Sequence, residues 1–275
     1  MKPFIREKKI ESNKTYREVD IFSTTDIQPK ISNRTKKEIS RPAQRNLNDK
    51  NSKRYFVQLA EANFTEGDWA IELTYFDAFY PETVEDADRE MKNCLRRIQS
   101  LLKKKHLPPL KYLAVTSDVS GETGKPVRIH HHLFIKADLS FDEIREIWRR
   151  PKKKGEKEGA RIGRINIDRL IPDEHFDISG KAYYFGKQRR GRKRWFGSLN
   201  LKKPVRLPNA DHKFTHRQID RLAAAVPFPL WGKDINSHPN IDFWKKQYPG
   251  WRIVSYIPEW NNFRGWAIYL KLRRQ

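Results

Sequence analysis

Residues 127–135 read VRIHHHLFI, and the alternation in this stretch separates an apolar face from a face that carries histidines. Successive side chains of a strand point to opposite faces of its sheet. The apolar phase, which we expect to be buried, contains Val127, Ile129, Leu133 and Ile135. The opposite phase contains Arg128, His130, His132 and Phe134. His130 and His132 therefore lie side by side on one face of the predicted strand, while His131 falls in the apolar phase.

Two imidazoles on one face are candidate ligands of a metal ion, because neutral imidazoles at this spacing can chelate a divalent cation. The alternative is a solvated or tag-like histidine run, but tags lie at chain termini and are not framed by alternating apolar residues.

Asp118 is the candidate third ligand. It ends a predicted strand over 111–118, in which Leu113 and Val115 take the core phase. We therefore expect Asp118 on the opposite face, with the histidines. Imidazoles and a carboxylate with open positions would bind Mg²⁺ or Mn²⁺ and leave room for phosphate oxygens. The alternative is that Asp118 is a turn residue before 119–121.

The composition restricts the class of partner. The chain has 275 residues, with 57 Lys and Arg against 34 Asp and Glu, and a formal net charge of +23 at pH 7. This excess of positive charge indicates a polyanionic partner. With 12% aromatic residues, the chain is too rich in core-forming and stacking groups for a disordered basic tail. We expect a folded nucleic-acid-binding protein rather than a membrane-surface peptide.

The same composition predicts the compartment. Cys94 is the only cysteine, which argues against an intramolecular disulfide or a cysteine zinc site and favours a reducing environment. No apolar run approaches the roughly twenty residues of a spanning helix, and the first residues lack the apolar core of a signal peptide. We expect a soluble, cytoplasmic protein with no membrane partner.

The order of predicted elements indicates an α+β fold. The apolar patterns predict strands over 69–75, 111–118, 127–135 and 162–167, and helices over 84–102, from 140 and over 177–188. Thr83 with Asp86, and Ser140 with Glu143, are typical helix caps. The order β-α-β-β-α-β is ferredoxin-like, an antiparallel sheet with helices on one face and the other face free for a site.

We expect the remaining segments to extend this core. Residues 1–39 are a basic N-terminal segment with one predicted strand over 16–22, either an edge strand or a mobile segment. Residues 40–204 form the core domain, which a helix over 40–63 opens. Residues 205–275 form a C-terminal extension packed on the same domain.

Residues 180–188 read GKAYYFGKQ and supply two candidate nucleophiles, Tyr183 and Tyr184. Both phenols and Lys187 lie away from the apolar stripe of the predicted helix, so helical phase alone does not choose between them. A phenol near a basic amine and a metal ion loses its proton more easily. The alternative is that both tyrosines are packing groups.

The segment 188–203 is a candidate DNA-binding surface. Its cations would contact phosphates and its aromatic groups would stack on unpaired bases. The expected contact residues are Arg189, Arg190, Arg192, Lys193, Arg194, Trp195, Lys202 and Lys203. The alternative is a solvated loop.

Taken in order, these motifs resemble the HUH endonucleases, in particular the rolling-circle replication initiators of bacterial phages, plasmids and integrating elements. The resemblance covers most of residues 40–272. It rests on the stretches His130-His131-His132, Tyr184-Phe185-Gly186-Lys187, Leu73-Thr74-Tyr75, Lys193-Arg194-Trp195, Ser198–Pro204 and Tyr248-Pro249-Gly250.

The resemblance implies a reaction and a role for each matching residue. Members nick one DNA strand through a 5′-phosphotyrosine link, and the released 3′-hydroxyl primes synthesis. His130 and His132 become metal ligands, Tyr184 the nucleophile by its Tyr-x-x-Lys spacing, and Lys187 the charge that positions it. Asp118 stands where the family often has another ligand. The implied partners are single-stranded DNA at an origin and the helicase and polymerase of a bacterial host.

Two other functions compete with this interpretation. A single-tyrosine HUH transposase or a relaxase would share the fold, although relaxases tend to carry three histidine ligands and a nucleophile near the N-terminus, which this chain lacks. A non-catalytic basic DNA- or RNA-binding protein with structural histidines would use the same charged surface.

Overall fold

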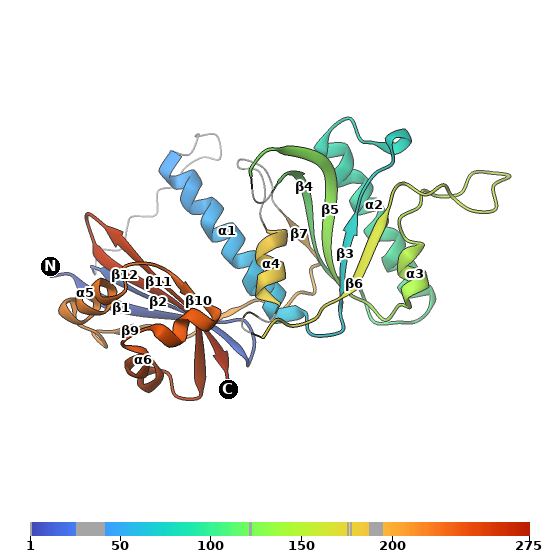
Figure 1. The fold of residues 1–275 in the computed structure, drawn as a ribbon. Coiled ribbons are helices and arrows are strands. Elements are labelled where there is room, and N and C mark those ends of the chain that lie inside the picture. Colours follow the sequence, from blue (N-terminus) through green and yellow to red (C-terminus); the bar gives the residue numbers. More distant parts are fainter. Residues whose placement is uncertain (1, 26–41, 121–122, 175, 177, 187–194) are drawn as a thin grey trace. The chain divides into compact units, whose positions relative to one another are not determined.

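The computed structural model describes residues 2–25, 42–120, 123–174, 176, 178–186 and 195–275, and shows a mixed α+β protein with antiparallel sheets (Figure 1). The chain divides into two compact units. Unit 1 comprises Met1–Ser40, Glu174–Phe176 and Lys203–Gln275, and unit 2 comprises Arg41–Asp173 and Asp177–Lys202. No helix in the described part of the chain is long and apolar enough to cross a membrane.

Unit 2 is built on an antiparallel sheet with the strand order β6-β3-β5-β4-β7. Its strands are β3 (Trp69–Leu73), β4 (Lys111–Val119), β5 (Pro126–Lys136), β6 (Ile165–Arg169) and β7 (Phe196–Gly197). Its helices are α1 (Pro42–Asn63), α2 (Val84–Lys104), α3 (Phe141–Arg145) and α4 (Ser179–Phe185), with a 3-10 turn at Asp77–Phe79. The histidine stretch thus lies on β5, the central strand.

The caps expected from the sequence begin two of these helices. The Thr83 side chain accepts a hydrogen bond from the backbone N–H of Asp86 at the start of α2. Ser140 and Glu143 form a capping box at the start of α3. The apolar side of α2, which includes Cys94, is buried. The cap and the apolar stripe together fix where α2 begins and which of its sides packs on the sheet.

Helices cover both faces of the unit 2 sheet. On one face, α2 and Trp148 pack against Leu133 of β5. On the opposite face, α1 and α4 pack against Phe134 of β5. Figure 1 shows α2 and α3 on one side of the strands and α1 and α4 on the other. The face that we expected to be free is therefore partly covered, because Phe134 and its neighbours are apolar on that face as well.

Unit 1 has its own antiparallel sheet, in the order β10-β11-β12-β2-β1-β8, with β9 paired to β1. The strands are β1 (Phe4–Glu11), β2 (Tyr16–Thr24), β8 (Val205–Arg206), β9 (Ala210–Asp211), β10 (Leu230–Trp231), β11 (Trp251–Asn261) and β12 (Gly265–Arg274). The helices are α5 (His216–Ala225) and α6 (Ile241–Gln247), with a 3-10 helix at Gly232–Ser237.

This second sheet differs from our expectation that 1–39 and 205–275 extend a single core domain. Strand β2 pairs with β12, with Ile21 opposite Ile268. Both isoleucines lie in a hydrophobic core that also contains Trp244 and is separate from the two cores of unit 2. The N- and C-terminal segments are joined because their apolar phases face the same core.

Candidate metal centre

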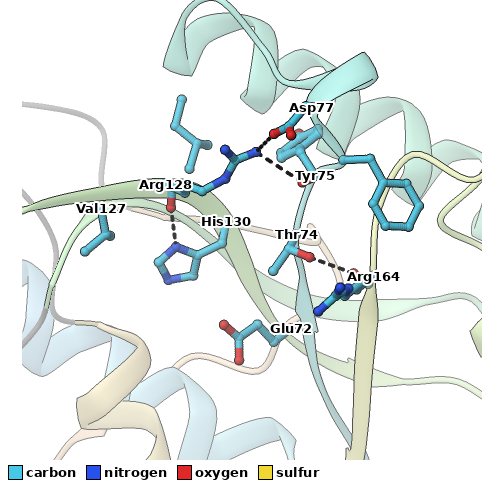
Figure 2. A pocket seen from close by; sticks show the side chains of 10 residues that line it. Glu72, Thr74, Tyr75, Asp77, Val127, Arg128, His130 and Arg164 are labelled. Carbon is cyan, nitrogen blue, oxygen red and sulfur yellow. Dashed lines mark hydrogen bonds and ion pairs between the residues drawn. The ribbon is translucent and has the colours of Figure 1, made fainter.

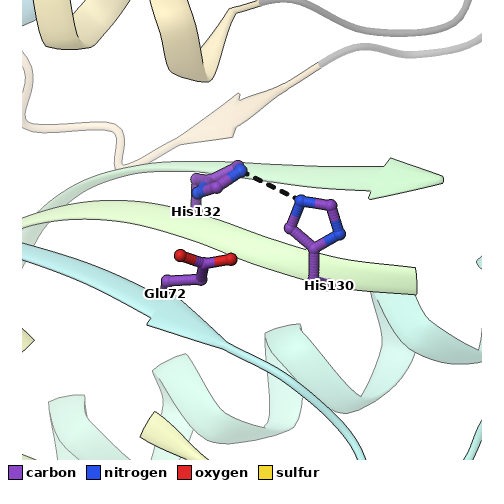
Figure 3. A group of neighbouring side chains, drawn as sticks. All are labelled: Glu72, His130 and His132. Carbon is purple, nitrogen blue, oxygen red and sulfur yellow. Dashed lines mark hydrogen bonds between the residues drawn. The ribbon is translucent and has the colours of Figure 1, made fainter. Parts of the chain in front are cut away.

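Glu72, His130 and His132 converge on one face of the unit 2 sheet (Figure 3). Glu72 lies on β3 directly opposite His132 on β5, so the two side chains share a face. One ligand atom from each of the three residues lies within 4.8 Å of the others. The expected pairing of His130 and His132 is thus confirmed, and their carboxylate neighbour is Glu72.

The hydrogen bonds of His130 fix which of its ring nitrogens can bind a metal ion. Its Nδ1 lies 2.8 Å from the backbone carbonyl oxygen of Arg128 (Figure 2). A carbonyl oxygen only accepts, so Nδ1 carries the hydrogen and donates it. The lone pair of the neutral ring is then on Nε2, which faces His132.

His132 has an environment suited to a ligand. Burial, with smaller effects of His130 and Lys181, lowers its pKa to about 3, so the ring is neutral near pH 7. Its Nδ1 is buried and has no hydrogen-bond partner among the described residues. The Phe185 ring stacks on the imidazole, with centroids 4.5 Å apart at 20°. Packing against Phe185, and not a hydrogen bond to Nδ1, therefore holds the orientation of the His132 ring.

The spacing of the two imidazoles fits a shared ion. Two nitrogens bound about 2.1 Å from one ion stand about 3.0 Å apart at a right angle and about 3.4 Å apart at the tetrahedral angle. The distance between the Nε2 atoms of His130 and His132 is 3.1 Å. Glu72 adds a carboxylate oxygen, so the three side chains can hold a divalent cation and leave coordination positions for a substrate.

Asp118 does not belong to this group. In the pairing of β4 with β5, Ser117 lies opposite His130 and Thr116 opposite His131, and the register shifts between Ser117 and Val119. Thr116, which we expected on the face of His130 and His132 together with Asp118, therefore points to the opposite face, that of His131. We assigned the phase incorrectly because both faces are buried, so apolar residues of β4 do not mark a single core side.

Glu72 was missed as a candidate. Trp69, Ile71 and Leu73 of β3 point to one face and are buried in the core. Glu72 is the charged residue of β3 that points to the opposite face. That signal becomes a ligand assignment only when β3 is known to pair with β5 in this register.

Tyr184 lies next to the metal centre. Its ring centroid is 5.7 Å from that of His132, at an angle of 69°. Half of the Tyr184 side chain is exposed, so a substrate can reach the phenol. Tyr183 is also exposed, but successive residues of a helix are rotated by about 100°, so it points in another direction. Lys187 lies outside the described residues.

The expected DNA-binding segment is only partly described. Arg189, Arg190, Arg192, Lys193 and Arg194 lie outside the described residues. Trp195 donates a hydrogen bond from Nε1 to Ser52 Oγ at 3.2 Å and packs beside Phe56, and it is partly buried. Lys202 and Lys203 are exposed.

His131 is buried on the opposite face, in a partly buried series of hydrogen bonds formed by Tyr75, His131, Thr116 and Asp88. Burial raises the pKa of the Tyr75 phenol, which keeps its proton and lies 2.7 Å from His131 Nε2. Thr116 donates its only hydroxyl hydrogen to Asp88, so it must accept from His131 Nδ1, 3.0 Å away. Each donor in this series of hydrogen bonds therefore has one acceptor. Burial lowers the pKa of His131 to about 3, so its ring is neutral.

Comparison of the chain with protein-family models, with curated proteins and with solved structures gave no match.

Proposed function

We propose that unit 2 is an HUH-type endonuclease that nicks and rejoins single-stranded DNA through a 5′-phosphotyrosine intermediate, as a rolling-circle replication initiator does. The observation that carries this proposal is the position of Tyr184 beside His132, which brings an exposed phenol to a group that can hold a divalent cation. A nucleophile and a site for charge on the scissile phosphate are the two parts that phosphodiester exchange requires.

The topology of unit 2 supports the ferredoxin-like part of the proposal. The elements follow the chain order β3-α2-β4-β5-α3-β6, and the corresponding strands lie in the sheet order β6-β3-β5-β4. Both orders are those of a βαββαβ fold. The site then lies on the face opposite α2.

In the proposed reaction the Tyr184 oxygen attacks the phosphorus of one phosphodiester. The phenol proton is lost as the new P–O bond forms, the bond to the 3′-oxygen breaks, and that oxygen takes up a proton. One P–O bond replaces another, so the 3′-hydroxyl can reverse the step and rejoin the strand. Phe185, stacked on His132 and Phe134, holds the end of α4 against the sheet and so positions Tyr184.

The cation is proposed to be Mg²⁺ or Mn²⁺, held by Glu72, His130 and His132. When bound, it would draw charge from the non-bridging oxygens of the scissile phosphate. Two imidazoles suit Mn²⁺ better than Mg²⁺, which prefers an all-oxygen environment.

Covalent capture tests this function. The full chain is incubated with MnCl₂ and a labelled library of random single-stranded oligonucleotides, and adducts that survive denaturation are measured. The wild type and Tyr183→Phe should form adducts, whereas Tyr184→Phe should form none because it lacks the attacking oxygen. A peptide map that places the nucleotide on Tyr183 would reassign the nucleophile. No adduct in the wild type, with binding retained, would support a non-catalytic DNA-binding protein.

A further inference from the structure

A pocket of about 480 Å³ opens beside the metal centre (Figure 2). Glu72 and His130 line it, but His132 does not. Its size lies within the range of about 300–1,000 Å³ that is typical of small-ligand sites. The pocket is therefore continuous with the metal group and has room for more than a single phosphate.

Two arginines line this pocket, Arg128 and Arg164. Arg128 is held in place: it donates to Asp77 Oδ1 at 2.7 Å and lies 4.5 Å from the centroid of the Tyr80 ring. Arg164 is exposed, and its guanidinium has no acidic partner among the residues that the structure describes. Arginine is well suited to phosphate, because its planar donors match the phosphate oxygens.

The backbone that carries Arg164 is fixed. The Arg164 carbonyl accepts a hydrogen bond from Thr74 N–H at 3.0 Å, and the Thr74 carbonyl accepts one from Trp148 Nε1 at 2.7 Å. Gly163 makes this approach possible, because a Cβ atom there would lie 1.8 Å from the Thr74 carbonyl oxygen. The start of the Arg164 side chain therefore has a defined position relative to β3.

The pocket also offers apolar surface. Phe76 and Val127 line it, and about two-fifths of each side chain is exposed. An exposed aromatic ring near arginines is typical of surfaces on which unpaired bases stack. A ligand with phosphate, sugar and base would satisfy both parts of the lining.

The direction from which Tyr184 attacks the phosphorus indicates which nucleotide of the DNA strand would occupy this pocket. The Tyr184 ring lies beside His132 of β5. Residues 127–130 of β5 line the pocket, so the pocket lies on the other side of His130 from Tyr184. In an in-line displacement the leaving oxygen departs on the side opposite the nucleophile. The leaving 3′-oxygen then faces the pocket.

We infer that this pocket binds the nucleotide immediately 5′ of the nick, an inference that rests on the proposed function. Its 5′-phosphate lies between Arg128 and Arg164, its base lies against Phe76 and Val127, and its 3′-oxygen points to the metal group. The matching free ligand is a deoxynucleoside 5′-monophosphate, and a deoxynucleoside 3′-monophosphate has the phosphate on the wrong side.

Paramagnetic broadening by Mn²⁺ tests this inference without chemistry. The four deoxynucleoside 5′-monophosphates are titrated with Tyr184→Phe protein that holds substoichiometric Mn²⁺, and their proton and phosphorus signals are recorded. The sugar H3′ signal should broaden most. A second substitution in this protein, Arg164→Gln, should weaken binding of the 5′-monophosphates by about tenfold, because one charge-assisted hydrogen bond is lost. The matched control Arg96→Gln, an exposed arginine on α2, should leave binding unchanged.

The outcomes separate the pocket from the reaction. Equal binding of the 3′-monophosphates, or binding that Arg164→Gln does not weaken, overturns the inference. Covalent adducts of wild-type protein with the random library would then still support the nuclease. If the inference holds, the 3′-hydroxyl fragments released from random-library DNA should show a preference for their terminal base that Phe76→Ala protein loses.

Discussion

Replacing Tyr75 by Phe should destabilise unit 2 by about 1–3 kcal/mol, the cost of an unpaired buried polar group. The change removes one hydroxyl, which donates to His131 Nε2 at 2.7 Å. His131 is 0% exposed, so no water can replace the lost donor. The ring of residue 75 keeps its contacts with Trp148, which limits any loss of packing.

Tyr80→Phe is the matched control. Its hydroxyl also takes part in one hydrogen bond, which it accepts from the backbone N–H of Ile129 at 3.0 Å, but the residue is 38% exposed. An exposed hydroxyl gives up less hydration on folding than the buried hydroxyl of Tyr75, so the loss should be smaller than that of Tyr75→Phe.

Native-state hydrogen exchange of the β5 amides in urea is the assay, because it reports on unit 2 separately from unit 1. A double-mutant cycle of Tyr75→Phe with His131→Leu should show a coupling of at least about 0.5 kcal/mol, because the two side chains share one hydrogen bond. Equal effects of Tyr75→Phe and Tyr80→Phe, or full additivity in the cycle, would refute the assigned hydrogen-bond chain.

Three further outcomes are expected. Glu72→Gln should weaken Mn²⁺ binding, measured by calorimetry, by about tenfold or more, whereas Asp118→Asn should change it less than about twofold; the reverse order would restore Asp118 as the ligand. Gly163→Ala should destabilise unit 2 by more than about 1 kcal/mol in urea, because its Cβ would meet the Thr74 carbonyl; a neutral result would contradict that close approach. Burial acts to raise the pKa of Glu7, but hydrogen bonds from Lys213 and Tyr248 and the charges of nearby lysines bring the pKa below its usual value of 4.5. The ionised Glu7 carboxylate therefore stabilises unit 1 above pH 4.5, and this stabilisation is lost as the pH falls through the lowered pKa. Urea midpoints should therefore fall less on acidification in Glu7→Gln than in the wild type, and identical pH profiles would contradict this.

The sequence predicted the parts of unit 2 that depend on local pattern. The alternation in β5 placed His130 and His132 on one face, and Thr83 marked the start of α2. These features follow from strand and helix periodicity and from cap chemistry, which neighbouring residues decide. The order of β3 to β6 along the chain followed from the same patterns.

The features that the sequence did not predict depend on partners distant in the chain. Glu72 became visible as a ligand only through its register opposite His132. The phase of β4 was misassigned because Leu113 and Ala114, on opposite faces, are both buried. Burial on two faces removes the polar alternation from which a single-sequence analysis infers orientation.

The pairing of β2 with β12 has a consequence for synthesis of the protein. On a ribosome, β1 and β2 emerge before unit 2, but β12, the strand that completes their sheet, emerges after it. A lone two-stranded hairpin is marginally stable in water, so this segment must wait while the whole of unit 2 is translated. Unit 2 can fold during that interval, because its residues are contiguous apart from a short excursion. A nascent chain stalled before residues 265–274 would leave the open edge of β2 available to other strands, which makes translational arrest in this region a route to aggregation.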